Sequence, residues 1–315
     1  MVEQVLLCDL SLAPSVGVSL AAPGRRPDAV SRFTCTTRTQ FDDKVRAFLG
    51  ERQDPALMGA ALSARGWEQN QELHLIGLDF TLNRDDIRDL LGVQRVNFLN
   101  NFVARALAVP TLRRNEKIQI CGGDAHDEHA IAVLGPHHGL GLASLVSDGV
   151  GGWTALHGEG GHSDMPVKTE HEWRLIQAIR ARHGHVSRET CISVNGLSDI
   201  WYALHILADE IAPAITPLQI IEAARAGDPR AVEAINTMTG WLGAMAGDVA
   251  LILGASGGIY LTGALLDMMG DTFSTDLFTT HYLDKGPRSA YVEQIPVFRT
   301  LAAEMEIAGL ATLYD

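Results

Sequence analysis

Short apolar runs alternate with amphipathic stretches along most of the chain. The runs predict β-strands, whereas stretches with apolar residues three or four positions apart predict helices. Residues 4–10 and 16–22 are apolar runs on either side of Pro14, so we expect a β-hairpin with the proline in its turn. Residues 29–37 alternate and are rich in threonine, which predicts a third antiparallel strand.

The same alternation continues through the first third of the chain. Phe41 and Phe48 fall on one face of a helix expected over residues 41–49. Asn83, followed by acidic residues, is a suitable N-cap for a helix that ends near Gly92. Further strands are expected over residues 56–63, 73–78 and 93–98, and a helix over residues 100–109 is expected to end at Pro110.

The rest of the chain shows the same periodicities with longer helices. Asp228 as N-cap and Pro229 at the first helical position predict the start of a long apolar helix over residues 228–253. Mixed strands and helices predict an α/β fold, and we expect its domains to be joined near Pro110 and Arg299. The other expected elements are strands over residues 118–121, 130–134, 139–146, 259–262 and 295–299, and helices over residues 170–183, 194–204, 217–226 and 306–314.

Composition narrows the class of protein. The 315 residues, 46% hydrophobic and 20% charged, are enough for one large or two medium globular domains. A net charge of −13 argues against a nucleic-acid partner, because nothing offsets repulsion from the phosphate backbone. The sequence contains neither an apolar stretch of the ~20 residues that span a membrane nor a basic signal-peptide start. We therefore expect a cytoplasmic protein with no membrane partner, whose four scattered cysteines are reduced and mostly buried: Cys8, Cys35, Cys121 and Cys191.

A glycine-rich stretch over residues 156–164 holds the most concentrated polar chemistry. Glycines let a backbone pass close to a ligand, while Glu159 accepts hydrogen bonds and His162 donates or accepts them. That pairing binds sugar hydroxyls, and a solvated polar loop is the alternative interpretation. Asn100 and Asn101 follow a predicted strand, at the sheet edge where α/β folds bind ligands, and helix capping is their alternative interpretation.

Other polar clusters have less specific patterns. Glu189 offers a second carboxylate, or an ordinary acidic first turn of a helix. Residues 122–129 include several possible metal ligands, and His137 and His138 form a pair. Neither group has the helical spacing of a HExxH zinc motif, so no metal site is expected at either place.

Several segments together resemble one family. They are residues 97–102 (NFLNNF), 139–143 (GLGLA), 158–164 (GEGGHSD), 184–189 (GHVSRE) and 257–263 (GGIYLTG). In this order, and with the closing segment over residues 295–310, the chain resembles bacterial ATP-dependent glucokinases over nearly its whole length. It resembles the group outside the ROK kinases, because the clustered cysteines of the ROK zinc motif are absent.

The resemblance implies the actin-like, RNase-H-like architecture of two-domain sugar kinases. It implies a small α/β domain of residues 1–110 and about 299–315, and a large one of residues 111–298, with the active site in the cleft between them. Members of the family are usually homodimers that move the γ-phosphoryl group of MgATP to the 6-hydroxyl of glucose. ATP and Mg²⁺ are thus the implied cofactors, and glucose or a related hexose is the implied partner.

Residue roles follow from the same resemblance. A fan of ring hydroxyls is matched by carboxylates, amides and an imidazole, which make charge-assisted and neutral hydrogen bonds. The implied sugar contacts are Asn100, Asn101, Glu159, His162 and Glu189, and the implied nucleotide contacts are Asp9, His138, Gly139, Gly141 and Gly263.

Four positions depart from the family's pattern. Asn101 stands where the family has its catalytic base, an aspartate, and an amide takes no proton at neutral pH. Residues 9–15 (DLSLAPS) replace the first phosphate loop, Asp-x-Gly-Gly-Thr-Asn, and keep only Asp9. His137 and His138 replace the first two residues of the second phosphate loop, Gly-Thr-Gly-Leu-Gly. Ala264 replaces a glycine near the adenosine site, which is a mild change.

These departures leave three hypotheses open. The first is a hexose-binding member of the glucokinase family with greatly reduced or no kinase activity, in effect a pseudokinase that acts as a sugar sensor or regulatory partner. The second is an active hexose kinase with reworked phosphate handling, in which His137 or His138 meets the γ-phosphate. The third, a metal-dependent hydrolase, has the least support from the sequence.

Overall fold

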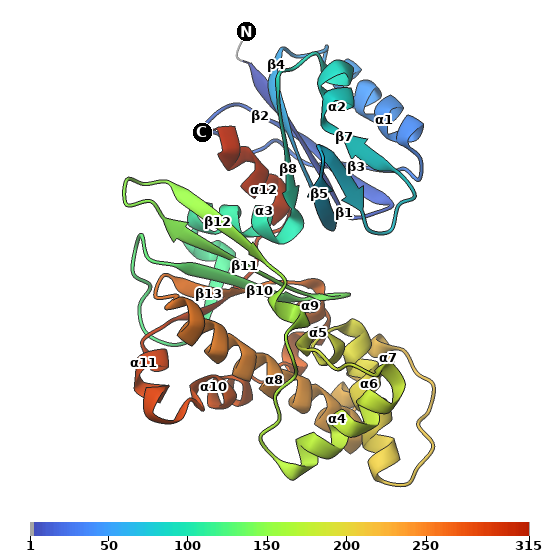
Figure 1. Cartoon of the computed structure of the whole chain (residues 1–315), viewed down its shortest axis with the longest axis vertical. Helices are drawn as coiled ribbons and strands as arrows, with labels where there is room; N and C mark the ends of the chain where they lie inside the picture. The colour runs from blue at the N-terminus through green and yellow to red at the C-terminus, as the bar shows by residue number, and fades with distance from the viewer. Residues whose placement is uncertain (1–2, 315) are drawn as a thin grey trace. The chain divides into compact units, whose positions relative to one another are not determined.

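The computed structural model describes residues 3–314 and divides into two compact units. The first unit runs up to Arg113 and resumes at Ala302, and the second unit is Arg114–Leu301. The units are thus discontinuous in the chain, because the closing segment returns to the first unit (Figure 1).

The first unit is built on a five-stranded mixed sheet. The β1–β2 hairpin and β3 are antiparallel, whereas β4 and β8 run parallel to β1. The predicted hairpin is confirmed, and Ala13 and Pro14 lie between its strands. In sheet order the strands are β3 (Ser31–Thr34), β2 (Ser15–Ala21), β1 (Gln4–Leu12), β4 (Leu57–Ala64) and β8 (Arg95–Asn100).

Two cores cover the two faces of this sheet. Leu6 and Leu10 of β1 face one core, which α1 (Arg38–Gly50) and α2 (Arg84–Leu91) complete. Leu7 faces the other core, which contains α3 (Asn101–Ala108) and α12 (Met305–Ala311), as the alternation of side chains along a strand requires. Figure 1 shows α1 and α2 together on one side of this sheet, with α3 and α12 on the other.

The helix α12 packs unusually close to α3. A Cβ atom at Gly309 would lie 1.7 Å from the carbonyl oxygen of Ala104, so only glycine fits there. The closing segment thereby buttresses the helix that starts at Asn101. The predicted helix over residues 306–314 corresponds to α12 and the following 3₁₀ turn Thr312–Tyr314.

One predicted strand of the first unit is wrong in extent. The expected strand over residues 73–78 ends at Leu75, because the following residues turn and Gly77 has φ +95°. It is the middle strand of a small antiparallel sheet whose other strands were not predicted. Few side chains of this sheet are buried, so the hydrophobic pattern of its strands is weak. The three strands are β5 (Gly66–Gln69), β6 (Glu72–Leu75) and β7 (Thr81–Asn83).

The second unit contains a six-stranded sheet with parallel strands at its centre. The strands β10, β13 and β14 are parallel, and the strands outside them are antiparallel to their neighbours. In sheet order the strands are β12 (Trp153–Gly158), β11 (Leu140–Ser147), β10 (Ile131–Pro136), β13 (Gly258–Leu261), β14 (Val297–Thr300) and β9 (Lys117–Cys121).

The helices of the second unit share one large core with one face of this sheet (Figure 1). The long helix α8 begins after the N-cap Asp228 with Pro229, as predicted, and packs against α10 along a face of glycines. A Cβ atom at Gly243 would lie 2.3 Å from the carbonyl oxygen of Phe278. The helices are α4 (Glu170–His183), α5 (Arg188–Cys191), α6 (Val194–Leu207), α7 (Pro217–Arg225), α8 (Pro229–Leu253), α9 (Ala264–Met269), α10 (Thr275–Leu283) and α11 (Ser289–Glu293).

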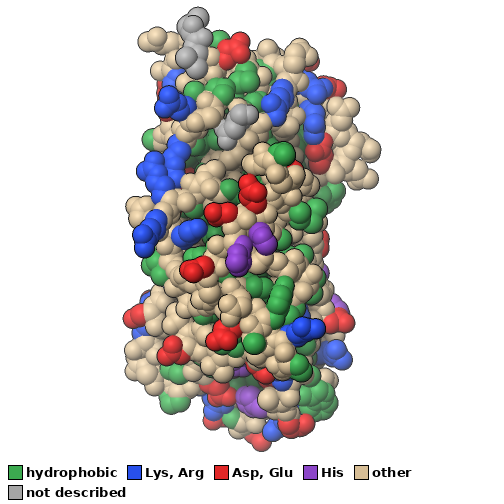
Figure 2. Space-filling model, turned by 90° about the vertical axis from the view of Figure 1, so that its left-hand side faces the viewer, with side chains coloured by type: hydrophobic (Ala, Val, Ile, Leu, Met, Phe, Trp, Pro, Cys, Tyr) green, Lys and Arg blue, Asp and Glu red, His purple; other side chains and the backbone are tan. Residues whose placement is uncertain are grey.

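The charged surface residues and the cysteines of residues 3–314 show no unusual arrangement. Lys and Arg side chains lie among acidic and apolar side chains on the face in Figure 2. The four cysteines are free thiols, and Cys8, Cys35 and Cys191 are buried, as predicted. Within the described residues, no helix is both long and apolar enough to cross a membrane.

Candidate functional site

The glycine-rich loop of the second unit begins where β12 ends, at Gly158. It forms a 3₁₀ turn over Gly160–His162, in which the His162 N–H donates to the Glu159 carbonyl at 3.0 Å. Gly161 is buried against the first residue of β11, and a Cβ atom there would lie 2.1 Å from the Leu140 carbonyl oxygen. The glycine therefore sets how closely the loop approaches β11, while the side chains of Glu159 and His162 remain 68% and 61% exposed.

Glu189 lies beside this loop, although it comes from a different segment. It sits in the first turn of α5, and its Oε2 accepts a hydrogen bond from the Leu140 N–H at 2.8 Å. Its Oε1 lies 3.7 Å from Nε2 of His162. A Cβ atom at Gly139 would lie 2.5 Å from Oε2, so this glycine makes room for the carboxylate. The structure therefore brings His162, Glu189 and Gly139 together.

Glu159 has a looser position in the same loop. Its Oε1 lies 3.4 Å from Nε2 of His157, and both side chains are largely exposed. The alternative interpretation of a solvated side chain describes Glu159 in this structure, whereas Glu189 is only 32% exposed and is held by a backbone N–H. The site thus combines a carboxylate of α5 that is fixed by a backbone N–H with an exposed carboxylate of the loop.

The two asparagines of the first unit occupy the start of α3. Asn100 is the N-cap, and its Oδ1 accepts from the Phe102 N–H at 2.8 Å, which is the capping role considered from the sequence. Its Nδ2 lies 3.4 Å from the Gly66 carbonyl oxygen. Asn101 is the first residue of the helix and is 7% exposed. The amide oxygen of Asn100 is therefore engaged within its own helix.

Asp9 is buried in the first unit, where one of its oxygens accepts several internal hydrogen bonds. Its Oδ1 accepts hydrogen bonds from the Ser63 hydroxyl at 2.8 Å and from both the N–H and the hydroxyl of Ser11. Burial raises the pKa of Asp9 to about 6, with a further contribution from the nearby Glu306, and these hydrogen bonds oppose the rise. Ser63 was missed from the sequence, although it stands at the end of a predicted strand beside β1.

The buried carboxyl of Asp9 does not fit Mg²⁺ coordination. Mg²⁺ takes accessible oxygen ligands in nearly octahedral geometry and usually keeps several waters. Asp9 is only 3% exposed, and its Oδ1 already accepts three hydrogen bonds. A raised pKa further weakens it as an anionic ligand, so the residues present here do not fit a metal–phosphate site at Asp9.

The other implied nucleotide contacts lie in or near the turn between β10 and β11. The His137 N–H donates to the Gly139 carbonyl at 2.7 Å, and the rings of His137 and His138 meet edge to face with centroids 4.4 Å apart. Gly141 pairs with a residue of β10 in the sheet. Gly263, with φ +114°, packs so near that a Cβ atom would lie 2.4 Å from the Pro136 carbonyl oxygen. The structure thus places Gly263 beside this turn.

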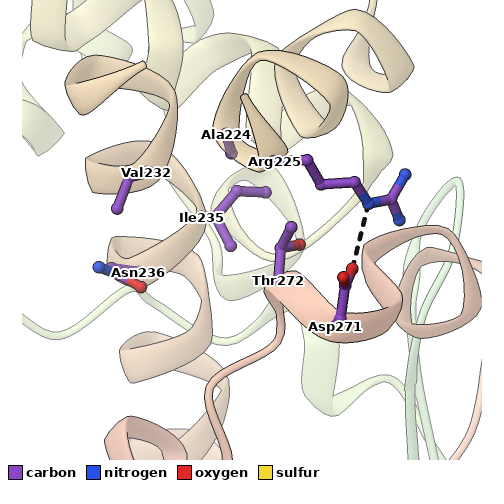
Figure 3. Close-up of a pocket in the computed structure, with 7 residues that line it drawn as sticks. All are labelled: Ala224, Arg225, Val232, Ile235, Asn236, Asp271 and Thr272. Atoms are coloured by element: carbon purple, nitrogen blue, oxygen red, sulfur yellow. Dashed lines mark hydrogen bonds and ion pairs between the residues drawn. The ribbon is translucent and has the colours of Figure 1, made fainter. Parts of the chain in front are cut away.

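Metal ligands and cavities do not define a competing site. Among residues 3–314, no group of three or more His, Cys, Asp or Glu side chains is arranged to hold a metal ion. A cavity of about 350 Å³ lies between α7, α8 and the 3₁₀ turn Gly270–Thr272, where Arg225 and Asp271 pair at 3.1 Å (Figure 3). None of the predicted site residues is among those that line it: Ala224, Arg225, Val232, Ile235, Asn236, Asp271 and Thr272.

The cluster at Glu189 is chemically suited to a polyhydroxylated ligand. Glu189 Oε1 can accept a hydrogen bond from a hydroxyl, and the imidazole of His162 can donate to or accept from the same or a neighbouring hydroxyl. The partner that holds Glu189, the Leu140 N–H, was missed from the sequence because a backbone amide 49 positions away carries no sequence signal. The cluster therefore has the hydrogen-bond donors and acceptors that hydroxyl recognition requires.

Comparisons with known proteins agree with this chemistry. The family model described as glucokinase matches residues 16–315. A glucokinase-like protein of Caulobacter vibrioides is 33% identical over 95% of this chain and 93% of its own length. A glucokinase of Aromatoleum aromaticum is also 33% identical, over 93% of this chain and 89% of its own.

The fold comparison gives the same result. The crystal structure of a glucokinase from an Antarctic psychrotroph matches with a TM-score of 0.90 and 25% identity, and the match covers 100% of this chain and 99% of that one. The predicted two-domain α/β sugar-kinase fold is confirmed by this match. Because the family model, the relatives and the fold agree over nearly the whole chain, this protein belongs to the glucokinase family.

Proposed function

We propose that this protein binds glucose or a closely related hexose and phosphorylates it with ATP at a greatly reduced rate or not at all. The proposal rests on two observations. The family is one of ATP-dependent glucose kinases, and some residues of this chain differ from the pattern of that family. The observation that carries it is Asn101, an amide at the position where the resemblance puts a catalytic carboxylate. The proposed sugar contacts are Asn100, Asn101, Glu159, His162 and Glu189.

The hexose side of the proposal is supported by Glu189 and His162. One oxygen of Glu189 is fixed by the Leu140 N–H, which leaves Oε1 turned toward His162 at 3.7 Å. A hydroxyl near these two groups can donate to the carboxylate and accept from the imidazole. Because the carboxylate is already held in place, hexose binding costs little ordering of this side chain.

Slow phosphoryl transfer follows first from residue 101. The attacking 6-hydroxyl must lose its proton, and a carboxylate at this position would accept it. An asparagine orients the hydroxyl through its amide oxygen but takes no proton at neutral pH. Loss of a general base costs about 10²–10⁴ in rate, although positioning and electrostatics lower much of the barrier in this reaction.

The β1–β2 hairpin supports the same conclusion independently. Loops that cradle phosphates present backbone N–H groups to the oxygens. In this hairpin the Ser11 N–H donates to Asp9, the Ala13 N–H donates to the Leu10 carbonyl at 3.2 Å, and Pro14 has no N–H. The amides of Ser11 and Ala13 are therefore engaged within the turn, and Pro14 has none.

An active hexose kinase with reworked phosphate handling is the competing proposal. It is favoured by the position of His137 and His138. They directly precede Gly139 and Leu140, and the Leu140 N–H donates to Glu189. In that case an imidazolium would replace the lost hydroxyl and glycine of the second phosphate loop. We also propose the cytoplasmic location and the homodimer that the resemblance implies. Light scattering of the purified protein tests the homodimer.

Two assays separate these proposals. Titration calorimetry with glucose should show binding at millimolar concentration or below, and Glu189→Gln should weaken it. A coupled assay of glucose-dependent ADP formation should give a turnover far below the roughly 1–100 s⁻¹ of ordinary kinases. A turnover in that range would establish the active kinase instead, and the absence of heat with glucose would remove the hexose site.

A further inference from the structure

Arg188, the residue before Glu189, connects three segments of the second unit. Its backbone N–H donates to the Ser163 carbonyl at 2.9 Å, in the loop that carries His162. Its side chain is only 14% exposed, and Nη2 donates to Oδ2 of Asp248 at 2.7 Å. Asp248 lies near the end of the long helix α8, so a single residue ties the loop and α5 to the largest helix of the unit.

Asp248 is itself held from the other side. Lys285 is 6% exposed, and its Nζ donates to Oδ1 of Asp248 at 2.7 Å and to the Ala244 carbonyl at 2.8 Å. The absence of a side chain at Gly247 makes this possible, because a Cβ atom there would lie 2.3 Å from Cε of Lys285. Each oxygen of Asp248 therefore faces one cation, and the cation on the Oδ1 side is almost fully buried.

The charge balance of this group favours the ionised form of Asp248. Its partial burial alone would raise its pKa, but hydrogen bonds from Lys285 and Arg188 outweigh that effect and bring the pKa below its usual value. The Nε atom of Arg188 is buried without a hydrogen-bond partner among the described residues. The bond to Asp248 is therefore the one that compensates the burial of the guanidinium.

The helix α5 needs such support because it has four residues. A helix of that length is not stable alone in water, because nucleation of the first turn is unfavourable and too few further hydrogen bonds follow to offset it. Its own bonds are a capping box between Ser187 and Thr190 and the bond from the Ile192 N–H to the Arg188 carbonyl at 2.7 Å. The direction of Glu189 thus depends on what anchors this turn to the rest of the unit.

We propose that Arg188 is a positioning residue for Glu189, and that Asp248, braced by Lys285, is the anchor against which it works. The proposal rests on the role of Glu189 in the proposed hexose site. It places the determinant of hexose affinity partly in α8 and in Lys285, which follows α10, on side chains that need no contact with sugar. Removal of either member of the Arg188–Asp248 pair should leave Glu189 chemically intact and poorly placed.

The test uses two readouts on the full-length variants Arg188→Met and Asp248→Asn. The first is the glucose Kd from calorimetry, which should rise about tenfold in both, since small displacements of a binding group have costs of this size or more. The second needs no ligand: exchange of the Leu140 amide hydrogen, followed by NMR, should accelerate about tenfold relative to other amides of β11 when Glu189 is released.

A matched control separates positioning from general stability. Arg182→Met breaks another ion pair of the second unit, in which Arg182 Nη1 lies 3.1 Å from Oδ1 of the buried Asp199. This variant should lower Tm by less than Arg188→Met does, because Arg182 is 43% exposed and Asp199 keeps His183 at 2.9 Å. The glucose Kd and the exchange of the Leu140 amide should stay within twofold of wild type. Arg188→Lys, which retains a cation, should recover part of the lost affinity.

The outcomes are distinct. The positioning role is overturned if Arg188→Met and Asp248→Asn unfold at lower temperature but keep both the wild-type Kd and the wild-type exchange of the Leu140 amide. If wild type binds no glucose but the two variants accelerate Leu140 exchange, the proposed hexose function fails and the positioning of Glu189 by Arg188 stands.

Discussion

The carboxylates of Asp9 and Glu189 have opposite uses in the same protein. Glu189 has one oxygen fixed by a backbone N–H and the other turned toward a largely exposed imidazole. Asp9 is almost fully buried, and one of its oxygens accepts three internal hydrogen bonds. A carboxylate that keeps an accessible acceptor can recognise a ligand, whereas Oδ1 of the buried Asp9 is already committed to internal hydrogen bonds. From this contrast we propose that the Glu189 cluster belongs to the hexose site, whereas the β1–β2 hairpin is poorly suited to bind phosphate.

The largest expected effect is at Gly161. In Gly161→Ala the new methyl group would lie 2.1 Å from the Leu140 carbonyl oxygen, so the loop must move away from β11 and take His162 with it. We expect glucose affinity to fall by about 100-fold, a typical cost of displacing binding groups by roughly 1 Å. Calorimetry measures the loss.

Gly158→Ala is the matched control for this change. It lies in the same glycine-rich stretch, but a Cβ atom there would meet nothing within 4 Å. Its glucose affinity should stay within about twofold of wild type, in line with small surface effects. Equal losses in the two variants would show that the close approach of the loop to β11 is irrelevant to binding.

The next largest effect is at Glu189. Glu189→Gln keeps an oxygen for the Leu140 N–H and removes the charge that faces His162. Hydrogen bonds to charged groups contribute about 1.5–3 kcal/mol, so glucose Kd should rise roughly 10- to 100-fold. An unchanged Kd, with glucose binding intact, would place the hexose elsewhere in the protein.

The sequence predicted the elements with strong local signals and missed those without them. Asn83 and Asp228 are N-caps where expected, because capping depends on residues next to one another in the chain. The strand β12 was missed because most of its side chains are exposed, so its pattern contains no apolar face. No element was predicted between residues 263 and 294, where three short helices pack on the core.

The sequence named the residues of the candidate site, but it contained no information on their geometry. The Glu189–Leu140 bond and the Asp9–Ser63 bond join residues 49 and 54 positions apart, and a one-dimensional pattern contains no trace of either. The capping role of Asn100 was one of two interpretations that the sequence left open, and the structure shows that role in its bond to Phe102.

A smaller effect is expected from pH at the hairpin. The pKa of Asp9 in the folded protein is raised to about 6 from 3.8, so the folded state holds a proton that the unfolded state has lost between these values. Stability should therefore fall as pH rises through this window. Asp9→Asn, which keeps an amide oxygen for Ser11 and Ser63, should flatten this decline and be more stable than wild type at pH 7 by about 1–2 kcal/mol.

Urea unfolding at pH 4.5, 6 and 7.5 checks this prediction. Asp43→Asn, at an exposed position of α1, is the control and should follow the wild-type pH dependence. A parallel decline in wild type and Asp9→Asn would mean that Asp9 ionises as readily in the folded as in the unfolded protein.

The smallest effect is expected from restoring the base. Asn101→Asp returns a proton acceptor to the start of α3 but leaves Pro14 and the spent amides of the hairpin unchanged. We expect turnover to rise by less than about tenfold, which is below the roughly 10²–10⁴-fold that a general base typically contributes. A gain of 10³ or more in the coupled assay would show that the hairpin does not limit phosphoryl transfer.

The most direct test of the contrast between the two regions is turnover measured on protein that is saturated with glucose. With the glucose Kd known from calorimetry, transfer of label from γ-³²P-ATP to glucose at saturating hexose gives turnover even when it is very slow. The preserved hexose cluster and altered hairpin predict saturable glucose binding with turnover at least 10² below the roughly 1–100 s⁻¹ of ordinary kinases. Turnover within that ordinary range would contradict the account.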